Sequence, residues 1–446
     1  MPSSRTGFML GCALLMACIG RASGTMTNAQ WQVRQAEALR KSDAIMDDAN
    51  RQRGLLARYR VMRRAYDENR DPVFHLIFDQ YLSWYQSYLG DYPAAAASFS
   101  MSQPRLPDDH TSPLSDPAYS ARSALQAIPE LAKNYRAVLF NEAHNVAQTR
   151  TLTVQLLGKL RQQGFNYFAA ETLYAADDKL QQRGYPIRDS GFYTEEPICA
   201  EMVRTALKLG YKIIAYEAGP QAQGDAREAE QARNIYNKVF RDDPHARLVV
   251  DAGYAHIQES GPFLGGASMA EHLHKLSGID ALTVEQTVMY AHQSGGDDHP
   301  YYSEVIRKLR PAQPIVFETR AGRPWTLRVG YDVSVFFPPP ELRRGRPTWL
   351  ELGGLRKPYT VNSDRCQRRY PCLVEARHAD EGADAIPADR LVLDPSSNAM
   401  VGGLPMFDAT RAVTGELYLR PGRYIVTYQN ENGHPRGDTS ITVTAK

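Results

Sequence analysis

Short apolar segments that run directly into a carboxylate recur six times between residues 136 and 318. Patterns typical of helices separate them, so we expect repeated strand–helix–strand units and a largely parallel sheet. The carboxyl ends of parallel strands meet at one edge, where open α/β sheets bind ligands, and we expect a site there. The expected strands are residues 137–140, 167–170, 213–216, 248–250, 281–284 and 315–317, and the acids that follow them are Glu142, Glu171, Glu217, Asp251, Glu285 and Glu318.

The segments between these strands show the boundary signals of crossover helices. Pro197 stands at an expected first turn, and glycine follows three of the expected ends at Gly164, Gly210 and Gly278. Proline at the start and glycine just past the end are the usual asymmetry of helix termini. The expected helices cover residues 146–163, 197–209, 225–240 and 268–276.

The two flanks of this α/β region have other periodicities. Residues 28 to about 100 place apolar side chains at helical intervals, and residues 84–99 resemble one tetratricopeptide helix pair. We expect a small helical module that packs on the α/β domain or binds a protein partner. After residues 338–340, short alternating segments divided by Pro and Gly predict a β-rich domain. The expected division is a signal peptide at 1–18, a helical module at 19–112, an α/β domain at 113–337 and a β-rich domain at 338–446.

The N-terminus has the anatomy of an export signal. Arg5 precedes a short apolar region that ends in the tetrapeptide Leu-Met-Ala-Cys at residues 15–18, which resembles the bacterial lipobox. Acylation of Cys18 would give a lipoprotein on the periplasmic side of the outer membrane. The alternative is an ordinary signal cleaved near Ala22 or Ser23, which would leave a soluble periplasmic protein.

Composition and cysteine usage narrow the partners and the compartment. The 52 Lys and Arg residues nearly balance the 50 Asp and Glu residues, for a net charge of +2. The basic residues are scattered and form no stripe with aromatic residues, so nucleic acid is not an expected partner. In an oxidising compartment Cys366 and Cys372 are expected to form a disulfide, and Cys199 lies in a helical pattern as a buried thiol.

The first expected strand ends in the candidate chemistry. Glu142 and His144 are two apart on an extended segment, so both side chains point to one side. Glu171 and His256 follow later strand ends and should join them at the same edge. Buried carboxylates and imidazoles at such an edge need partners or a function, so we assign these four residues as catalytic.

Other polar residues of this edge have two interpretations. Glu217, Asp251 and Glu285 either line the pocket or cap the next helix, and Arg227 either binds an anionic group or neutralises these acids. Tyrosines throughout the chain are assigned to packing. His292, Asp297, Asp298 and His299 are interpreted as a solvated loop over the site, with a metal cluster as the alternative. The expected substrate-binding residues are Asn145, Glu217, Arg227, Asp251, Tyr254 and Glu285.

Several short motifs resemble a known family. Residues 141–160, with Glu142, His144 and Asn145, resemble the first motif of the erythromycin-esterase-like superfamily, and within it the ChaN-like haem-binding lipoproteins. Ala170 and Glu171, then Arg227 and Glu228, then residues 250–256 follow in the order of the family. The resemblance covers the α/β part, about half of the chain. Asn141 departs from it, since the family has glycine at that position.

The resemblance and the residues together imply an exported hydrolase that acts on a small-molecule ester or related acyl bond without an obligatory cofactor. His144 would activate water as general base, Glu142 or Glu171 would stabilise it as imidazolium, and His256 would act on the carbonyl or the leaving group. One alternative is a haem- or iron-binding lipoprotein with Tyr254 and His256 as candidate ligands. A second alternative is a divalent-metal peptidase resembling the Tiki-type proteases, with His144, His256 and Glu171 as ligands.

Overall fold

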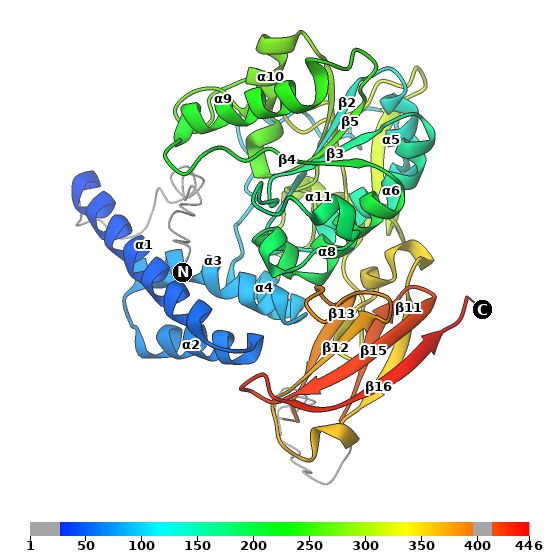
Figure 1. Ribbon diagram of the computed structural model, residues 1–446. Coiled ribbons are helices and arrows are strands. Elements are labelled where there is room, and N and C mark those ends of the chain that lie inside the picture. The colour runs from blue at the N-terminus through cyan, green and yellow to red at the C-terminus, as the bar shows by residue number, and fades with distance from the viewer. Residues whose placement is uncertain (1–26, 396–412, 446) are drawn as a thin grey trace.

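A six-stranded parallel sheet forms the centre of the α/β part (Figure 1). The computed structural model describes residues 27–395 and 413–445. The strand order is β4-β3-β5-β2-β6-β8, and every neighbouring pair is parallel. Five of the six expected strands belong to this sheet. The strands are β2 (Ala137–Glu142), β3 (Tyr167–Ala170), β4 (Lys212–Ala215), β5 (Leu248–Gly253), β6 (Ala281–Glu285) and β8 (Val333–Ser334).

Alternating side chains of the strands bury two separate cores. Val138 and Phe140 of β2 face one core, whereas Ala137 and Leu139 face the other. Helices cover both faces, as a parallel sheet requires. The four expected crossover helices are confirmed, with ends that shift by at most five residues. On the first face lie α5 (Ala124–Ala132), α6 (Gln148–Gln162) and α8 (Pro197–Lys208), and on the second α9 (Gly224–Ile235), which continues as a π-helix (Tyr236–Phe240), and α10 (Met269–Ser277).

The sixth expected strand was wrongly placed. β7 (Ile315–Thr319) pairs antiparallel with β1 (Tyr119–Ser123), and on its other side Phe336 bridges to Ile315 in antiparallel fashion. The edge of β6 is instead taken by the short strand β8, because Asp332 bonds both the backbone and the hydroxyl of Thr283. An antiparallel strand ends at the opposite edge, so Glu318 lies away from the other acids and pairs with Arg122.

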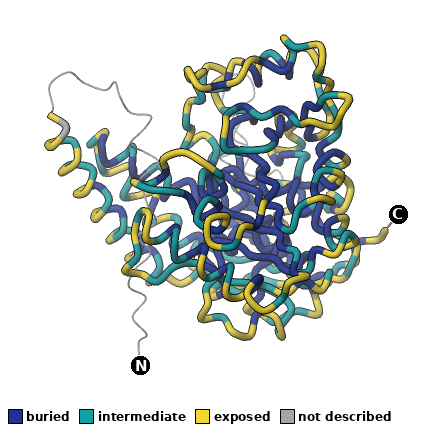
Figure 2. Tube along the Cα trace, turned by 90° about the horizontal axis from the view of Figure 1, so that it is seen from above, coloured by how far each residue is buried: buried dark blue, intermediate teal, exposed yellow. Residues whose placement is uncertain are grey.

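The helical module consists of four helices that pack through aromatic side chains. The turn between α3 and α4 passes through Gly90, which adopts φ +77°. Trp84, Tyr85 and Tyr88 of α3 are almost completely buried, although Trp and Tyr are amphipathic residues. Figure 2 shows that the buried residues run from this module into the α/β part, while α1 stays exposed along one side. The helices are α1 (Asn28–Arg51), α2 (Leu55–Glu68), α3 (Pro72–Tyr88) and α4 (Tyr92–Ser98).

The two histidines of the loop at residues 292–299 are tied into the fold, which corrects the expectation for these side chains, while residues 293–296 are exposed as expected of a solvated loop. His292 bonds Asp298, and its side chain is only 2% exposed. His299 accepts a hydrogen bond from the backbone of Tyr301 at the start of α11 (Pro300–Leu309) and contacts Asp109. Residues 103–112, assigned to the helical module, therefore lie against the α/β part. The remaining short elements are α7 (Leu180–Arg183), β9 (Leu342–Arg343), β10 (Arg346–Pro347) and the 3-10 turns Arg188–Ser190, Tyr193–Glu195, Tyr254–Ile257, Thr348–Gly354 and Asp364–Cys366.

The C-terminal part is the expected antiparallel β domain. Four strands form one sheet in the order β13-β12-β15-β16, and β11 pairs with β14 beside it. The expected disulfide is present between Cys366 and Cys372, with Cα atoms 5.9 Å apart, and Cys199 is a buried free thiol as expected. The strands are β11 (Lys357–Asn362), β12 (Cys372–His378), β13 (Asp389–Leu393), β14 (Thr414–Leu419), β15 (Gly422–Gln429) and β16 (Pro435–Val443).

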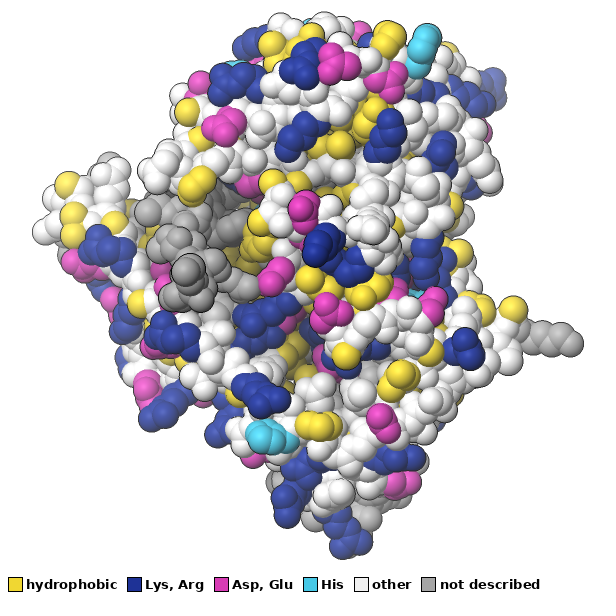
Figure 3. All heavy atoms as spheres, viewed as in Figure 1, with side chains coloured by type: hydrophobic (Ala, Val, Ile, Leu, Met, Phe, Trp, Pro, Cys, Tyr) yellow, Lys and Arg dark blue, Asp and Glu magenta, His cyan; other side chains and the backbone are white. Residues whose placement is uncertain are grey.

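The surface carries mixed charge. Figure 3 shows Lys and Arg side chains interspersed with Asp and Glu on the visible face, without a continuous basic stripe on that face. None of the helices in residues 27–395 and 413–445 is both long and apolar enough to cross a membrane. The proposed signal peptide and Cys18 lie outside the described residues.

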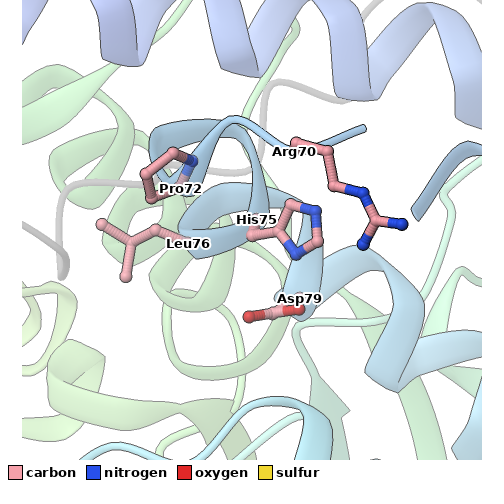
Figure 4. Close-up of a pocket in the computed structure, with 5 residues that line it drawn as sticks. All are labelled: Arg70, Pro72, His75, Leu76 and Asp79. Carbon is pink, nitrogen blue, oxygen red and sulfur yellow. The ribbon is translucent and has the colours of Figure 1, made fainter. Parts of the chain in front are cut away.

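A hollow of 410 Å³ in the helical module holds a carboxylate in an unfavourable setting. Figure 4 shows Asp79 one turn along α3 from His75, with Arg70 nearby. The Oδ1 atom of Asp79 is buried and has no hydrogen-bond partner within the described residues. Burial raises the pKa of Asp79 to about 6, and the nearby His75 opposes this shift only in part.

Asp79→Asn is expected to stabilise the protein at neutral and higher pH. Because the folded-state pKa lies above the ordinary value of 3.8, stability is lost as pH rises from that value through about 6. Thermal unfolding at about pH 8 should show a higher midpoint for the variant, and the difference should disappear below about pH 4. The control is Asp67→Asn, which removes an exposed ion pair with Arg63. A lower midpoint for Asp79→Asn at pH 8 would show that its carboxylate is stabilised by a partner.

Candidate functional site

Glu142 and His144 form a buried pair at the carboxyl end of β2. The Nδ1 atom of His144 lies 2.9 Å from Oε1 of Glu142, and the two residues are 5% and 4% exposed. A carboxylate only accepts hydrogen bonds, so Nδ1 carries a proton, and in the neutral imidazole the lone pair is on Nε2. β2 ends at Glu142 and His144 lies in the turn that follows, so this turn, and not the expected extended segment, brings the two side chains together.

Arg150 of α6 binds the carboxylate of Glu142. Its side chain is fully buried, and it pairs with Glu142 through Nε and donates to Oε1 of Glu142 from Nη2 at 2.9 Å. Nη2 also donates to the backbone carbonyl of His144 at 3.1 Å. Burial alone would raise the pKa of Glu142, but Arg150 and His144 outweigh it and lower that pKa. Glu142 is therefore ionised and can orient the imidazole.

Two tyrosine rings enclose the imidazole of His144. Tyr193 stacks on it with ring centres 4.1 Å apart and planes 14° apart, and Tyr254 meets it edge-on at 5.1 Å. Tyr254 adopts φ +45°, and its backbone carbonyl accepts a 2.8 Å hydrogen bond from Asn141. Asn141 thus fixes the strained turn at the end of β5. The sequence interpretation assigns Tyr193 to packing and expects Tyr254 to bind substrate, and in the structure both rings shape the surroundings of His144.

A second imidazole–carboxylate pair lies on the α9 side of the sheet. Nδ1 of His256 is 2.7 Å from Oε2 of Glu228, whose side chain is completely buried. The same oxygen accepts a hydrogen bond from the backbone N–H of Met269. Burial disfavours the charged imidazole, but Glu171 and Glu228 outweigh it, so the pKa of His256 is raised. His256 is suited to hold a proton in the site.

Glu171 connects the two pairs. Its Oε1 lies 3.5 Å from Nε2 of His256 and accepts a 2.9 Å hydrogen bond from Arg227, while Oε2 accepts from the backbone N–H of Gly253 at 2.6 Å. A Cβ atom placed on Gly253 would lie 2.5 Å from Nε2 of His144 and 3.1 Å from Oε2 of Glu171. Glu142, His144, Glu171 and His256 therefore converge at one place on the sheet edge.

Positive charge keeps Glu171 ionised. Burial would raise its pKa, but His256, Arg227 and His144 hold the pKa of Glu171 well below its usual range. Arg227 lies between two acids, because it also donates to Glu217 from Nε at 2.9 Å and from Nη2 at 2.6 Å. Of the two interpretations of Arg227, neutralisation of the acids is the one that its contacts support.

The remaining candidate residues lie around this cluster in different roles. Asp251 is buried beneath it, and burial together with Glu142 raises the pKa of Asp251 well above its ordinary value. Glu285 bonds the backbone and hydroxyl of Thr287 at the end of β6. Asn145 donates to the carbonyls of Ala95 and Phe99. The contacts of Glu285 and Asn145 are thus with the protein itself.

The helical module supports both sides of His144. On one side Asn145 is bonded to the end of α4, and on the other Trp84 and Tyr88 of α3 pack edge-on against Phe192, the neighbour of Tyr193. Arg58 of α2 forms a buried ion pair with Glu195, with Nη1 2.8 Å from Oε2. The module is therefore part of the structure that positions the site.

Contacts within the site argue against the metal alternative. Nδ1 of each imidazole is bonded to a glutamate, which leaves the two Nε2 atoms and the carboxylate of Glu171 as the possible ligands. Nη1 of Arg227 lies 3.4 Å from Nε2 of His256, and a fixed positive charge there opposes a divalent cation. Within residues 27–395 and 413–445, no group of three His, Cys, Asp or Glu side chains is arranged to hold a metal ion. These residues do not fit a resident metal.

The haem alternative meets a similar difficulty at His256. Nε2 of His256 lies 3.5 Å from Oε1 of Glu171 and 3.4 Å from Nη1 of Arg227. An axial ligand must instead present its donor atom to the iron. The buried hydroxyl of Tyr254 has no hydrogen-bond partner within the described residues, so its contacts do not argue against a ligand role.

Three residues of the site had no role in the sequence interpretation. Arg150 lies inside the first crossover helix, and the apolar residues Val146, Ala147 and Val154 at helical spacing from it were the available signal. Glu228 was noted beside Arg227 without a role, although the pair opens α9. Tyr193 lies in a 3-10 turn far along the chain from His144, and no periodic pattern marks it.

Comparisons with known proteins identify no relative of this chain by sequence. No protein-family model matches it, and no curated protein sequence matches it. Three of the solved structures that resemble it are bacterial toxins or effectors. The type III effector HopBA1 has 12% identity and a TM-score of 0.28, covering 41% of this chain and 95% of that chain.

The other two structures are similarly distant. The effector domain RRSP of a Vibrio vulnificus MARTX toxin has 16% identity and a TM-score of 0.27, over 51% of each chain. The C-terminal region of Pasteurella multocida toxin, described with a thiol-protease-like catalytic triad, has 14% identity and a TM-score of 0.26, over 37% of this chain and 25% of that chain. Likenesses at these scores support no statement about function.

Gly253→Ala is expected to separate His144 from Glu171. The backbone of Gly253 has φ −72°, which alanine adopts freely, so the effect would come from the added methyl group alone. That methyl would lie 2.3 Å from Cε1 of His144. We expect lower thermal stability and a changed imidazole environment of His144, observed by nuclear magnetic resonance of the ring nitrogens. The control is Gly158→Ala, where a Cβ meets nothing within 4 Å. An unchanged His144 signal would contradict the close approach.

Arg58→Ala is expected to lower the free energy of unfolding by about 3 kcal/mol, because it leaves Glu195 buried without its main partner. The control is Arg64→Ala on the same helix, which removes an exposed ion pair with Glu68 and should cost no more than about 0.5 kcal/mol. Urea unfolding measures both. Equal effects of the two variants would show that the helical module does not depend on the buried pair.

Proposed function

We propose that this protein is an exported hydrolase that cleaves an ester or related acyl bond, and that its α/β part has the erythromycin-esterase-like fold. The observation that supports the reaction is the convergence of two imidazole–carboxylate pairs on Glu171. His144 has a free Nε2 atom held in place by Glu142, and His256 has a raised pKa. Hydrolysis by general base and general acid requires two such groups at one site, in environments that favour different protonation states.

His144 acts as the general base in this proposal. Its Nε2 atom takes a proton from water while the water oxygen forms a bond to the carbonyl carbon of the substrate. Glu142 keeps the proton on Nδ1 and stabilises the imidazolium that results. Arg150 in turn holds Glu142, so the imidazole is oriented before the substrate binds.

His256 acts as the general acid. Its imidazolium transfers a proton to the leaving oxygen as the bond between carbon and that oxygen breaks, and Glu228 holds its Nδ1 atom. Glu171 lies beside Nε2 of His256 and stabilises the protonated form. The proton gained by His144 returns through solvent, which restores both imidazoles for the next cycle.

Export and lipid anchoring through Cys18 belong to the same proposal. They rest on the apolar N-terminal region and its Leu-Met-Ala-Cys ending, both outside the described residues. The disulfide between Cys366 and Cys372 is consistent with an oxidising compartment.

The test is hydrolysis of a panel of p-nitrophenyl esters by the full chain and two variants. His144→Ala should remove most of the activity, and Glu142→Gln should cost on the order of 10²-fold while the fold stays intact by circular dichroism. The control is His245→Ala, at an exposed position away from the cluster. Since the pKa of His256 is raised, activity should fall on the alkaline side as His256 loses its proton, at a pH above the ordinary histidine value.

Two outcomes would contradict the proposal of hydrolysis at the site of His144. One is full ester hydrolysis by His144→Ala, which would place the reaction elsewhere. The other is inactivity of the wild-type protein together with a sharp Soret band on addition of one equivalent of hemin, lost in His144→Ala. That result would replace hydrolysis by haem binding.

A further inference from the structure

The hydroxyl of Tyr193 is a buried polar group without a hydrogen-bond partner in the part of the chain that the structure describes. Tyr193 is only 2% exposed, and its ring lies flat on the imidazole of His144. Leaving a buried hydroxyl without a partner is unfavourable, because the hydrogen bonds that it makes to water are lost. Such a group beside a candidate catalytic residue therefore requires an explanation.

The position of this tyrosine is firmly held. Its backbone N–H donates to the hydroxyl of Thr172 at 2.8 Å, and Trp84 and Phe192 meet its ring edge-on at 5.9 Å and 5.1 Å. The guanidinium of Arg150 lies 5.9 Å from the ring centre. Contacts on several sides leave the ring little freedom to turn its hydroxyl towards another protein group. The hydroxyl is a fixed feature of the site.

The surroundings keep this hydroxyl neutral. Burial and the charge of Glu171 raise the pKa of Tyr193 well above its ordinary value. The O–H group is therefore a hydrogen-bond donor at neutral pH. The carboxylate of Glu171 already accepts hydrogen bonds from the backbone of Gly253 and from Arg227.

We propose that the Tyr193 hydroxyl donates a hydrogen bond to the carbonyl oxygen of the bound substrate, and more strongly to the oxyanion that forms when water adds. This inference rests on the hydrolase proposed above. No bond to Tyr193 forms or breaks; the hydroxyl stabilises the negative charge that develops next to His144. A fixed donor in a water-poor site is the usual source of such stabilisation.

The same geometry narrows the substrate class. Arg150 contacts Glu142 and Glu196, and Arg227 contacts Glu171 and Glu217, so each guanidinium is already neutralised by two glutamates. An anionic group beside the scissile bond would meet ionised carboxylates. A neutral donor such as the Tyr193 hydroxyl matches an uncharged carbonyl instead. The substrate is therefore an ester or amide without a negative charge next to its carbonyl group.

The experiment compares Tyr193→Phe with the wild-type full chain on p-nitrophenyl acetate. The variant keeps the ring that stacks on His144 and removes only the hydroxyl. We expect kcat to fall by about 10²-fold, while KM and the pH dependence of kcat stay unchanged, because the contact strengthens only in the transition state. The thermal midpoint should stay the same or rise, because a hydroxyl without a partner is removed.

Tyr302→Phe is the matched control, because the Tyr302 hydroxyl is also buried without a hydrogen-bond partner within the described residues but belongs to α11, outside the site. Its removal should leave kcat unchanged. A kcat for Tyr193→Phe within twofold of wild type would overturn the inference and leave the hydrolase intact. A lower thermal midpoint, or a shifted pH profile, would also overturn it, since the hydroxyl would then stabilise the protein or position His144. Wild-type protein inactive on every ester would remove both proposals.

Discussion

The fully buried guanidinium of Arg150 is the interaction on which the site depends. It pairs with Glu142, donates to the backbone carbonyl of His144, and approaches Glu196 at 3.3 Å. A buried cation without acids would be strongly unfavourable, so these contacts constrain α6, the end of β2 and the start of α8 together. Glu196 in turn caps α8 through the backbone of Ile198 and Cys199. Local helix formation and the orientation of the candidate base therefore have a common cause.

The three parts of the chain meet close to this buried charge. Tyr92 of the helical module donates to Glu196 at 2.8 Å, and Arg58 pairs with Glu195. From the β domain, Arg390 donates to the backbone carbonyls of Tyr88 and Glu195. The segment that contains Tyr193 is thus held by the helical module on one side and by the β domain on the other. The helical module, which in the sequence looks like an accessory part, is required to hold the ring of Tyr193 against His144.

Burial gives the cluster its chemical character. In a low-dielectric setting the pKa values of these groups are raised or lowered according to the charge of their partners. Glu171 stays ionised between Arg227 and His256, whereas Asp251, beneath it and without a positive partner as close, has a raised pKa. The pKa values of two carboxylates on neighbouring strands are therefore shifted in opposite directions. Glu171 can therefore stabilise an imidazolium, whereas Asp251 only lines the base of the site.

The sequence by itself determined the strands that run into acids and the crossover helices between them, because these depend on local periodicity. It also determined the short disulfide loop, since Cys366 and Cys372 are close along the chain. It could not determine the direction of β7, which depends on pairing with β1, nor the burial of His292 and His299. The roles of Arg150, Glu228 and Tyr193 were decided only by tertiary structure. Each of these side chains acts through partners distant in sequence, and packing of the whole chain is what brings such partners within hydrogen-bond distance.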